Sequence, residues 1–162
     1  MAAAPTELQL AGFRLGDTLF AVDIMRIREI VLPQRLAGMP LAVSALDGMI
    51  NLRGAVIPVL NLRARFGMPP LPGGSGKLMI VSLFGRQVAL AVDEVEDVIA
   101  VPVRDLTPPP DMVDGVGNEY LVAVCLHNGE LYLVLNIDAL FGYTDPGRSG
   151  SGAGEKEYHG SV

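Results

Sequence analysis

The chain has 162 residues, half of them apolar, with 19 glycines, 12 prolines and no tryptophan. A chain of this length buries about 68–70% of its unfolded surface, so one domain or two very small ones need no disulfide or metal. The net charge of −6 disfavours nucleic acid and anionic membrane as general partners. Short apolar runs separated by Gly, Pro, Asn and Asp predict an all-β protein with many turns.

The charge is divided unevenly along the chain. Residues 1–76 carry seven arginines and five carboxylates, whereas residues 77–144 carry three Lys or Arg and ten carboxylates. A weakly basic half joined to a strongly acidic half is compatible with head-to-tail association with a similar partner. A solvated acidic face that aids solubility explains the same pattern equally well.

The beginning of the chain predicts neither export nor membrane insertion. Residues 1–7 lack the basic start and apolar core of a signal peptide. No apolar run approaches the ~18–20 residues of a membrane-spanning helix. The single cysteine, Cys125, lies in an apolar run, which favours a buried strand thiol in a cytosolic protein.

Two similar hairpins are predicted. Apolar runs over residues 8–22 flank a glycine turn at 16–17, and similar runs over 77–92 flank a glycine turn at 85–86. Each hairpin ends in Ala-Val-Asp and continues into a mixed apolar and charged stretch. We interpret these stretches as turns that lead into curved edge strands; they span residues 24–31 and 94–99.

The most informative stretch runs from residue 51 to 67 and is partly duplicated. It predicts a tight turn, an apolar strand and a short helix that begins after Asn61 and ends at Gly67. Shifted by 75 positions, residues 54–67 align without a gap on residues 129–142, with seven of fourteen pairs identical. Only the first copy is preceded by Asn-Leu-Arg, so the copies are expected to share a scaffold but not a role.

These elements predict two five-stranded barrels with short helices. Within a folded region at 8–144, subdomain 1 is expected at about 14–72 and subdomain 2 at about 77–142. The first strand could instead complete the second barrel, which the sequence leaves open. One or two helical turns are expected at 40–48. Residues 145–162 are polar and glycine-rich, which predicts a flexible tail.

The sequence offers little catalytic or metal-binding chemistry. His127 and His159, the two histidines, lie 32 residues apart, which is not metal-ligand spacing. Residues 73–77 lack the full spacing of a phosphate-binding loop and are interpreted as a linker. The acidic cluster at 93–97 could in principle hold a cation, but a solvated or partner-facing edge is favoured. We therefore expect no enzymatic activity, no cofactor and no metal.

Arg53 is the polar residue that the pattern singles out. It lies one residue before a glycine turn and between apolar runs, where a guanidinium tends to be paired or presented to a partner. Glu29 is the expected partner. An exposed pair of this kind contributes only ~0–1 kcal/mol. An arginine that anchors the turn and an arginine positioned for recognition both remain open.

Several sequence blocks occur in a fixed order between residues 8 and 142. They are Phe13-x-Leu-Gly-Asp-x-x-Phe20-x-Val22-Asp23-Ile24, Ile27-x-Glu29-Ile30, Gly48-Met-Ile-Asn51-Leu-Arg-Gly54-x-x-Ile57-Pro58-Val59-x-Asn61-Leu62-Arg63 and Val92-Asp93-x-Val95-x-Asp97-Val98. Together they resemble the CheW family of chemotaxis coupling proteins. The third block is the most specific part of the resemblance.

The resemblance implies two SH3-like barrels and a non-catalytic adaptor in the cytoplasm. The implied partners are the cytoplasmic tips of methyl-accepting chemoreceptors and the regulatory domain of the histidine kinase CheA. Recruitment to membrane-associated receptor arrays is implied, without direct membrane insertion and without nucleic acid. The implied receptor-binding residues are Ile27, Glu29, Gly48, Asn51, Arg53, Gly54 and Val98. No residue is assigned to kinase binding.

By the same resemblance, Glu29 and Arg53 match a charged pair near the receptor-binding surface. Ile27 and Val98 match apolar positions beside the groove between the barrels, and the other three residues shape the loop that presents Arg53. One alternative is a coupling protein of pilus-based motility or another chemosensory system. A second, from a different class, is a free-standing double-barrel module that binds a small molecule or nucleic acid.

Overall fold

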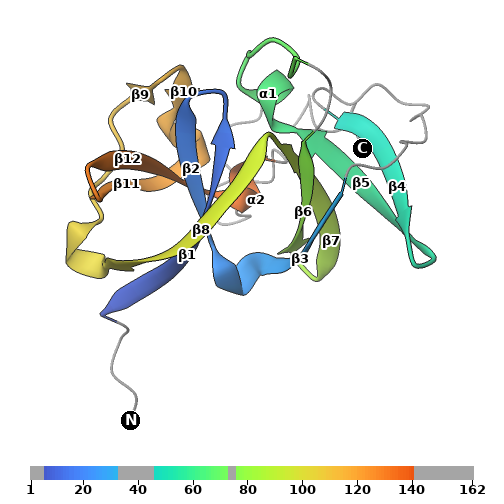
Figure 1. Cartoon of the computed structure of the whole chain (residues 1–162), viewed down its shortest axis with the longest axis horizontal. Coiled ribbons are helices and arrows are strands. Elements are labelled where there is room, and N and C mark those ends of the chain that lie inside the picture. Colours follow the sequence, from blue (N-terminus) through green and yellow to red (C-terminus); the bar gives the residue numbers. More distant parts are fainter. Residues whose placement is uncertain (1–5, 33–45, 73–75, 141–162) are drawn as a thin grey trace, which may run out of the picture.

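The computed structural model describes residues 6–32, 46–72 and 76–140, which form two five-stranded sheets (Figure 1). Sheet A has the strand order β11 (Leu121–His127), β12 (Glu130–Leu135), β2 (Thr18–Asp23), β1 (Glu7–Leu15) and β8 (Glu94–Pro102). Sheet B has the order β3 (Ile27–Val31), β6 (Lys77–Leu83), β7 (Arg86–Val92), β5 (Ala55–Asn61) and β4 (Leu46–Leu52). The predicted all-β fold with two SH3-like subdomains is confirmed.

Short elements connect the strands. They are η1 (Ile24–Arg26), α1 (Leu62–Arg65), η2 (Val103–Asp105), the two-stranded ribbon β9 (Met112–Val113) and β10 (Val116–Gly117), η3 (Asn118–Tyr120) and α2 (Ile137–Leu140). The helical turns expected at 40–48 are wrong for residues 46–48, which begin strand β4. The rest of that stretch and the expected tail at 145–162 lie outside the described residues.

The two predicted hairpins form, but each joins the sheet of the other half of the chain. The β1–β2 hairpin pairs with β12 and β8, which come from the second half. The β6–β7 hairpin pairs with β5 and β3, which come from the first half. One subdomain, here called the inserted subdomain, is therefore continuous over residues 27–92. The other, the terminal subdomain, is built from residues 7–23 and 94–140.

This exchange corrects the predicted boundary between subdomains 14–72 and 77–142. Each hairpin has one antiparallel and one parallel neighbour from the other half of the chain, and the parallel contacts are β2 with β12 and β7 with β5. Parallel neighbours cannot be joined by a tight turn, so their pairing links segments that are distant in sequence. Local patterns predicted each hairpin correctly and carried no information about its parallel partner.

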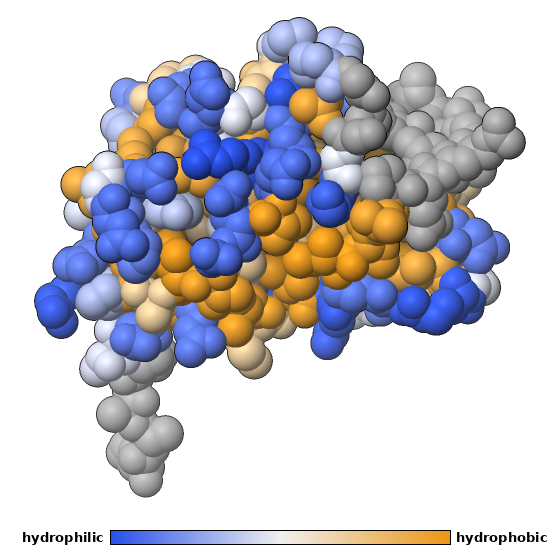
Figure 2. Space-filling view, in the orientation of Figure 1, coloured by the Kyte–Doolittle hydropathy of each residue, from blue (hydrophilic) through white to orange (hydrophobic). Residues whose placement is uncertain are grey.

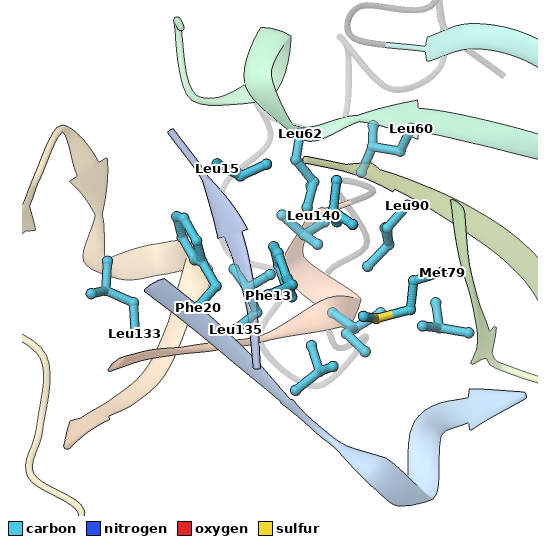
Figure 3. Close-up of a cluster of buried hydrophobic side chains, with 14 of the residues drawn as sticks. Phe13, Leu15, Phe20, Leu60, Leu62, Met79, Leu90, Leu133, Leu135 and Leu140 are labelled. Atoms are coloured by element: carbon cyan, nitrogen blue, oxygen red, sulfur yellow. The ribbon is translucent and has the colours of Figure 1, made fainter. Parts of the chain in front are cut away.

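The largest hydrophobic cluster is shared by both sheets. Figure 3 shows Phe13, Phe20 and Leu133 of sheet A together with Met79 and Leu90 of sheet B, all of them buried. A second cluster lies within sheet A and a third within sheet B. Central strands thus send alternate side chains to the shared cluster and to their own. Both faces are covered, which explains their continuous apolar runs.

A row of aromatic rings runs through the shared cluster. The rings of Phe13 and Phe20 stack at 5.4 Å, and Phe20 stacks on Phe66 at 5.5 Å. Phe66, which follows α1, meets Tyr120 of η3 edge to face at 5.5 Å. Ring pairs of this kind contribute about 0.5–1.5 kcal/mol beyond their burial. The row therefore ties Phe66 of the inserted subdomain to the terminal subdomain.

Candidate protein-docking site

Arg53 lies in a tight turn that forces an unusual backbone. Leu52 and Ala55 pair across the β4–β5 hairpin, and the two turn residues Arg53 and Gly54 have φ of 51° and 88°. Two positive φ values are the signature of a type I′ turn, which normally takes Asn-Gly or Asp-Gly. The Asn51 side-chain oxygen accepts a hydrogen bond from the Gly54 amide at 2.9 Å and closes the turn.

The second copy of the same turn has asparagine at its first position, the residue that such turns ordinarily contain. Asn128 and Gly129 have φ of 53° and 80° in the β11–β12 hairpin. Asparagine tolerates this conformation, whereas for most other side chains it costs about 1–2 kcal/mol. The backbone at Arg53 in the inserted subdomain is therefore strained, whereas the equivalent position in the terminal subdomain holds Asn128, which suits this conformation.

The guanidinium of Arg53 donates to the carboxylate of Glu29 on β3, as the sequence predicts. The Arg53 side chain remains 68% exposed and that of Glu29 33% exposed. Because β3 and β4 are opposite edges of sheet B, the pair joins the two edges and helps to close the subdomain. Most of the Arg53 side chain is still available to another molecule.

An apolar groove opens beside this turn. It has a volume of about 710 Å³ and forms where β5 and β7 begin, because these strands pair only from Val59 and Ala89 onward. Val56 and Phe84 are 62% and 58% exposed at its rim. The full lining is Ala55, Val56, Ile57, Pro58, Leu83, Phe84, Arg86, Gln87 and Val88.

Phe84 was missed by sequence reasoning, although a large apolar residue just before Gly85 in a predicted hairpin turn is itself a signal. It occupies the first position of the β6–β7 turn with φ of 50°, followed by Gly85 with φ of 80°. A large apolar residue is as unusual there as an arginine. Two neighbouring turns of the inserted subdomain thus hold exposed side chains in a strained backbone conformation, at Arg53 and Phe84. Together the two turns identify the candidate docking surface better than either turn does alone.

The seven predicted site residues do not form one cluster. Ile27 is half-buried on β3 against the shared hydrophobic cluster, and Val98 is 57% exposed on β8 of the other subdomain. Figure 2 shows an apolar area over the middle of the molecule, where the two subdomains meet. Ile27 packs against the hydrophobic cluster that both sheets share, Val98 lies exposed on the terminal subdomain, and the Arg53 turn belongs to the inserted subdomain.

Gly48 does not shape the Arg53 turn, which corrects its expected role. It lies buried within β4, opposite Val59, where the pairing register shifts. Its φ of 146° is one that residues with a side chain rarely adopt, so glycine permits the bulge. Gly54, in contrast, lies in the turn as expected.

A buried ion pair lies at the crossover between the subdomains. Arg63 of α1 donates to both carboxylate oxygens of Asp93 at 2.9 and 2.6 Å, and to the Pro69 carbonyl at 2.7 Å. The Gly16 amide donates to Asp93 at 2.6 Å. Burial by itself would raise the pKa of Asp93, but these hydrogen bonds and the charge of Arg63 hold it below its ordinary value. The hydrogen bond to Asp93 likewise raises the pKa of Arg63.

Two of the four carboxylates in the acidic cluster at 93–97 accept hydrogen bonds from arginines. Besides the Asp93 pair, Glu96 accepts from Arg14 at 3.1 Å. In the part of the chain that the structure describes, no three His, Cys, Asp or Glu side chains gather so as to hold a metal ion. Cys125 is confirmed as a buried strand residue, and burial raises the pKa of its thiol.

The exposed features are a charged turn, an apolar groove and an apolar junction. They define a protein-docking module built from two SH3-like subdomains. A family model described as a CheW-like domain matches residues 9–144, and the chain belongs to the CheW family. No helix in the described segments is long and apolar enough to cross a membrane.

Relatives of known name agree with this assignment. The chain is 34% identical over 146 residues to a chemotaxis protein CheW of Treponema pallidum, covering 87% of this chain and 86% of the relative. It is 30% identical to the protein FrzA of Myxococcus xanthus, covering 86% and 88%. The crystal structure of the scaffolding protein TtCheW from Thermoanaerobacter tengcongensis superposes with a TM-score of 0.77 at 26% identity, covering 83% and 92%.

Proposed function

We infer that this protein is a non-catalytic chemotaxis adaptor that holds chemoreceptor tips and the kinase CheA together at cytoplasmic, membrane-associated arrays. The observation that carries the proposal is the strained presentation of Arg53. The turn costs about 1–2 kcal/mol, and an exposed pair with Glu29 contributes only ~0–1 kcal/mol. Stability therefore does not explain the arginine, whereas recognition of a partner does.

The two kinds of surface suit two partners. We propose that a receptor tip occupies the apolar junction near Ile27 and Val98, with the Arg53–Glu29 pair at its border. The regulatory domain of the kinase would dock on the apolar groove, inserting a side chain between Val56 and Phe84. Each contact need only be modest, since repeated contacts in an array supply avidity.

A specific observation favours a second candidate within the same class. The 30% identity to FrzA is compatible with a coupling role in a different chemosensory system. A small-molecule binding module is supported only by the groove volume, which falls within the roughly 300–1,000 Å³ of ligand sites. The exposure of Val56 and Phe84 favours a protein partner over an enclosed ligand.

The receptor assignment is tested by reversing the charge of Arg53. In a reconstituted assembly of receptor tip, kinase and this protein, Arg53→Glu should weaken receptor coupling about tenfold or more, as expected for a loss of roughly 1.4 kcal/mol or more. Arg104→Glu, an exposed charge reversal on η2, is the matched control and should assemble normally. Normal assembly by Arg53→Glu with its fold intact would refute the assignment.

The kinase assignment is tested at Phe84. Phe84→Asn removes the ring but suits the positive φ, so the fold should be at least as stable as before. We expect weaker binding to the isolated regulatory domain of the kinase by calorimetry, with receptor coupling less affected. If binding of that domain is unchanged, the groove is not its docking site, and a screen for small ligands of the groove becomes the next experiment.

A further inference from the structure

Each crossover between the subdomains carries one side chain that contacts both of them. The first crossover is η1, which leads from β2 of the terminal subdomain to β3 of the inserted one (Figure 1). In η1 the guanidinium of Arg26 donates to the Ser82 carbonyl of β6 at 3.0 and 2.9 Å and to the Asp138 carboxylate of α2 at 2.8 Å. Because Ser82 belongs to the inserted subdomain and Asp138 to the terminal one, Arg26 bridges the two.

The Ser82 carbonyl lies just beyond the end of the β3–β6 ladder. The ladder ends where Ile27 is opposite Val81, so one further pair would place residue 26 opposite Ser82. The backbone instead turns into η1, where the Ile27 amide donates to the Ile24 carbonyl. The Arg26 side chain supplies the hydrogen bonds to Ser82, and the fixed fork of a guanidinium reaches a carboxylate at the same time.

The second crossover, between β7 and β8, is held by Asp93. It accepts from the Gly16 amide of the terminal subdomain at 2.6 Å and from Arg63 of the inserted one at 2.9 and 2.6 Å. The Arg63 and Asp93 side chains are 10% and 11% exposed, whereas those of Arg26 and Asp138 are 33% and 40% exposed. Water therefore competes more for the Arg26 contact, which is the more adjustable of the two.

The two contacts lie at opposite ends of the β6–β7 ladder. Ser82 is opposite Gln87, and Lys77 is opposite Val92, the residue before the second crossover. Five residues of strand separate these pairs, which corresponds to about 17 Å. Apolar burial in the shared cluster is non-directional, whereas hydrogen bonds weaken steeply away from linear geometry. Two such contacts at separate points fix an angle that burial alone restrains less.

We propose that Arg26 is a positioning residue, which fixes the angle between the two subdomains by bridging Ser82 and Asp138. A tilt about the Asp93 crossover moves β3 relative to β8. These strands carry Ile27 and Val98, where a receptor tip is proposed to bind, so Arg26 also preserves the shape of that surface. This last step rests on the proposed function, whereas the control of the angle does not.

The angle is measured with one spin label on each subdomain. Gln87→Cys on β7 and Val122→Cys on β11 are exposed attachment sites, and Cys125 is buried. By pulsed electron paramagnetic resonance, Arg26→Ala should broaden the distance distribution roughly 1.5-fold, because one of two restraints on the angle is lost. Arg26→Lys still pairs with Asp138 but lacks the fork, so its distribution should be intermediate. Arg104→Ala, at an exposed position on η2, is the matched control and should leave the distribution unchanged.

An unchanged distribution in Arg26→Ala would overturn the proposal, even if the melting temperature falls, since Arg26 would then stabilise the fold without setting the angle. With the distribution broadened, Arg26→Ala should also weaken receptor coupling roughly fivefold in the reconstituted assembly. A broadened distribution with full receptor coupling would support the role of Arg26 in the angle and refute the receptor site near Ile27 and Val98. The two inferences are thus tested separately.

Discussion

At the scale of single residues, two strained positions mark the surface of the inserted subdomain. Arg53 and Phe84 hold positive φ values at the first position of neighbouring hairpin turns. The comparable turns at Asp114 and Asn128 carry residues that suit this conformation. The turns at Asp114 and Asn128 have the same backbone geometry, so they show which residues the turn at Arg53 or Phe84 would ordinarily contain.

Replacing Arg53 by the residue of the second copy should separate stability from binding. Arg53→Asn removes the strain and the pair with Glu29, so the free energy of unfolding should change little or rise by up to about 1 kcal/mol. Receptor coupling should still be lost. Urea unfolding measures the first quantity and assembly with the receptor tip measures the second. A variant that loses stability and keeps coupling would show that Arg53 anchors the turn.

At the scale of elements, the Arg63–Asp93 pair connects α1, the β7–β8 crossover and the β1–β2 turn. The carboxylate of Asp93 neutralises the mostly buried guanidinium of Arg63 and accepts a hydrogen bond from the Gly16 amide of the β1–β2 turn. Removing one member of such a pair typically costs about 3–5 kcal/mol, because the other charge is left buried. The pair is therefore the expected weak point of the fold in acid.

Asp93→Asn should destabilise the protein at neutral pH and matter little in acid. The folded-state pKa of Asp93 is lowered, so its stabilisation is present above its ordinary value of 3.8 and is lost as pH falls through the lower folded value. The difference in unfolding free energy between wild type and variant should shrink accordingly. Asp97→Asn, on the exposed part of β8, is the control. A difference independent of pH would contradict this assignment.

The individual strands and helices were far easier to predict from the sequence than which strands pair with one another in the sheets. Glycine turns and apolar runs located both hairpins and the duplicated strand and helix, and Asn-Leu-Arg pointed to the Arg53 turn and its partner Glu29. Gly48 was misassigned because a strand bulge and a loop both favour glycine. Phe84 was overlooked because its exposure depends on where β5 and β7 separate, which is a contact between distant segments.

At the scale of the whole molecule, the exchange of hairpins makes the two halves of the chain interdependent. Residues up to 72 supply β1 and β2 to sheet A and β3 to β5 to sheet B, and the remainder completes both sheets. Neither half contains a complete sheet. The duplicated sequence therefore folds as one unit, although its repeats suggest two.

Cutting the chain between its halves should not separate them. With a protease site in place of residues 73–75, the cleaved protein should elute from a sizing column as one species of the original size under native conditions. The fragments should part only in denaturant, and neither should refold alone by circular dichroism. Two independently folded fragments would instead support separate barrels at 14–72 and 77–142.

The insertion of residues 27–92 also decides how the molecule carries mechanical load. Tension applied between β1 and α2 passes through sheet A, because both elements belong to the terminal subdomain. The inserted subdomain is attached through two crossovers that lie outside that path, near Arg26 and Asp93. Pulling on the ends of the chain thus strains the terminal sheet first and leaves the groove and the Arg53 turn undeformed until that sheet yields.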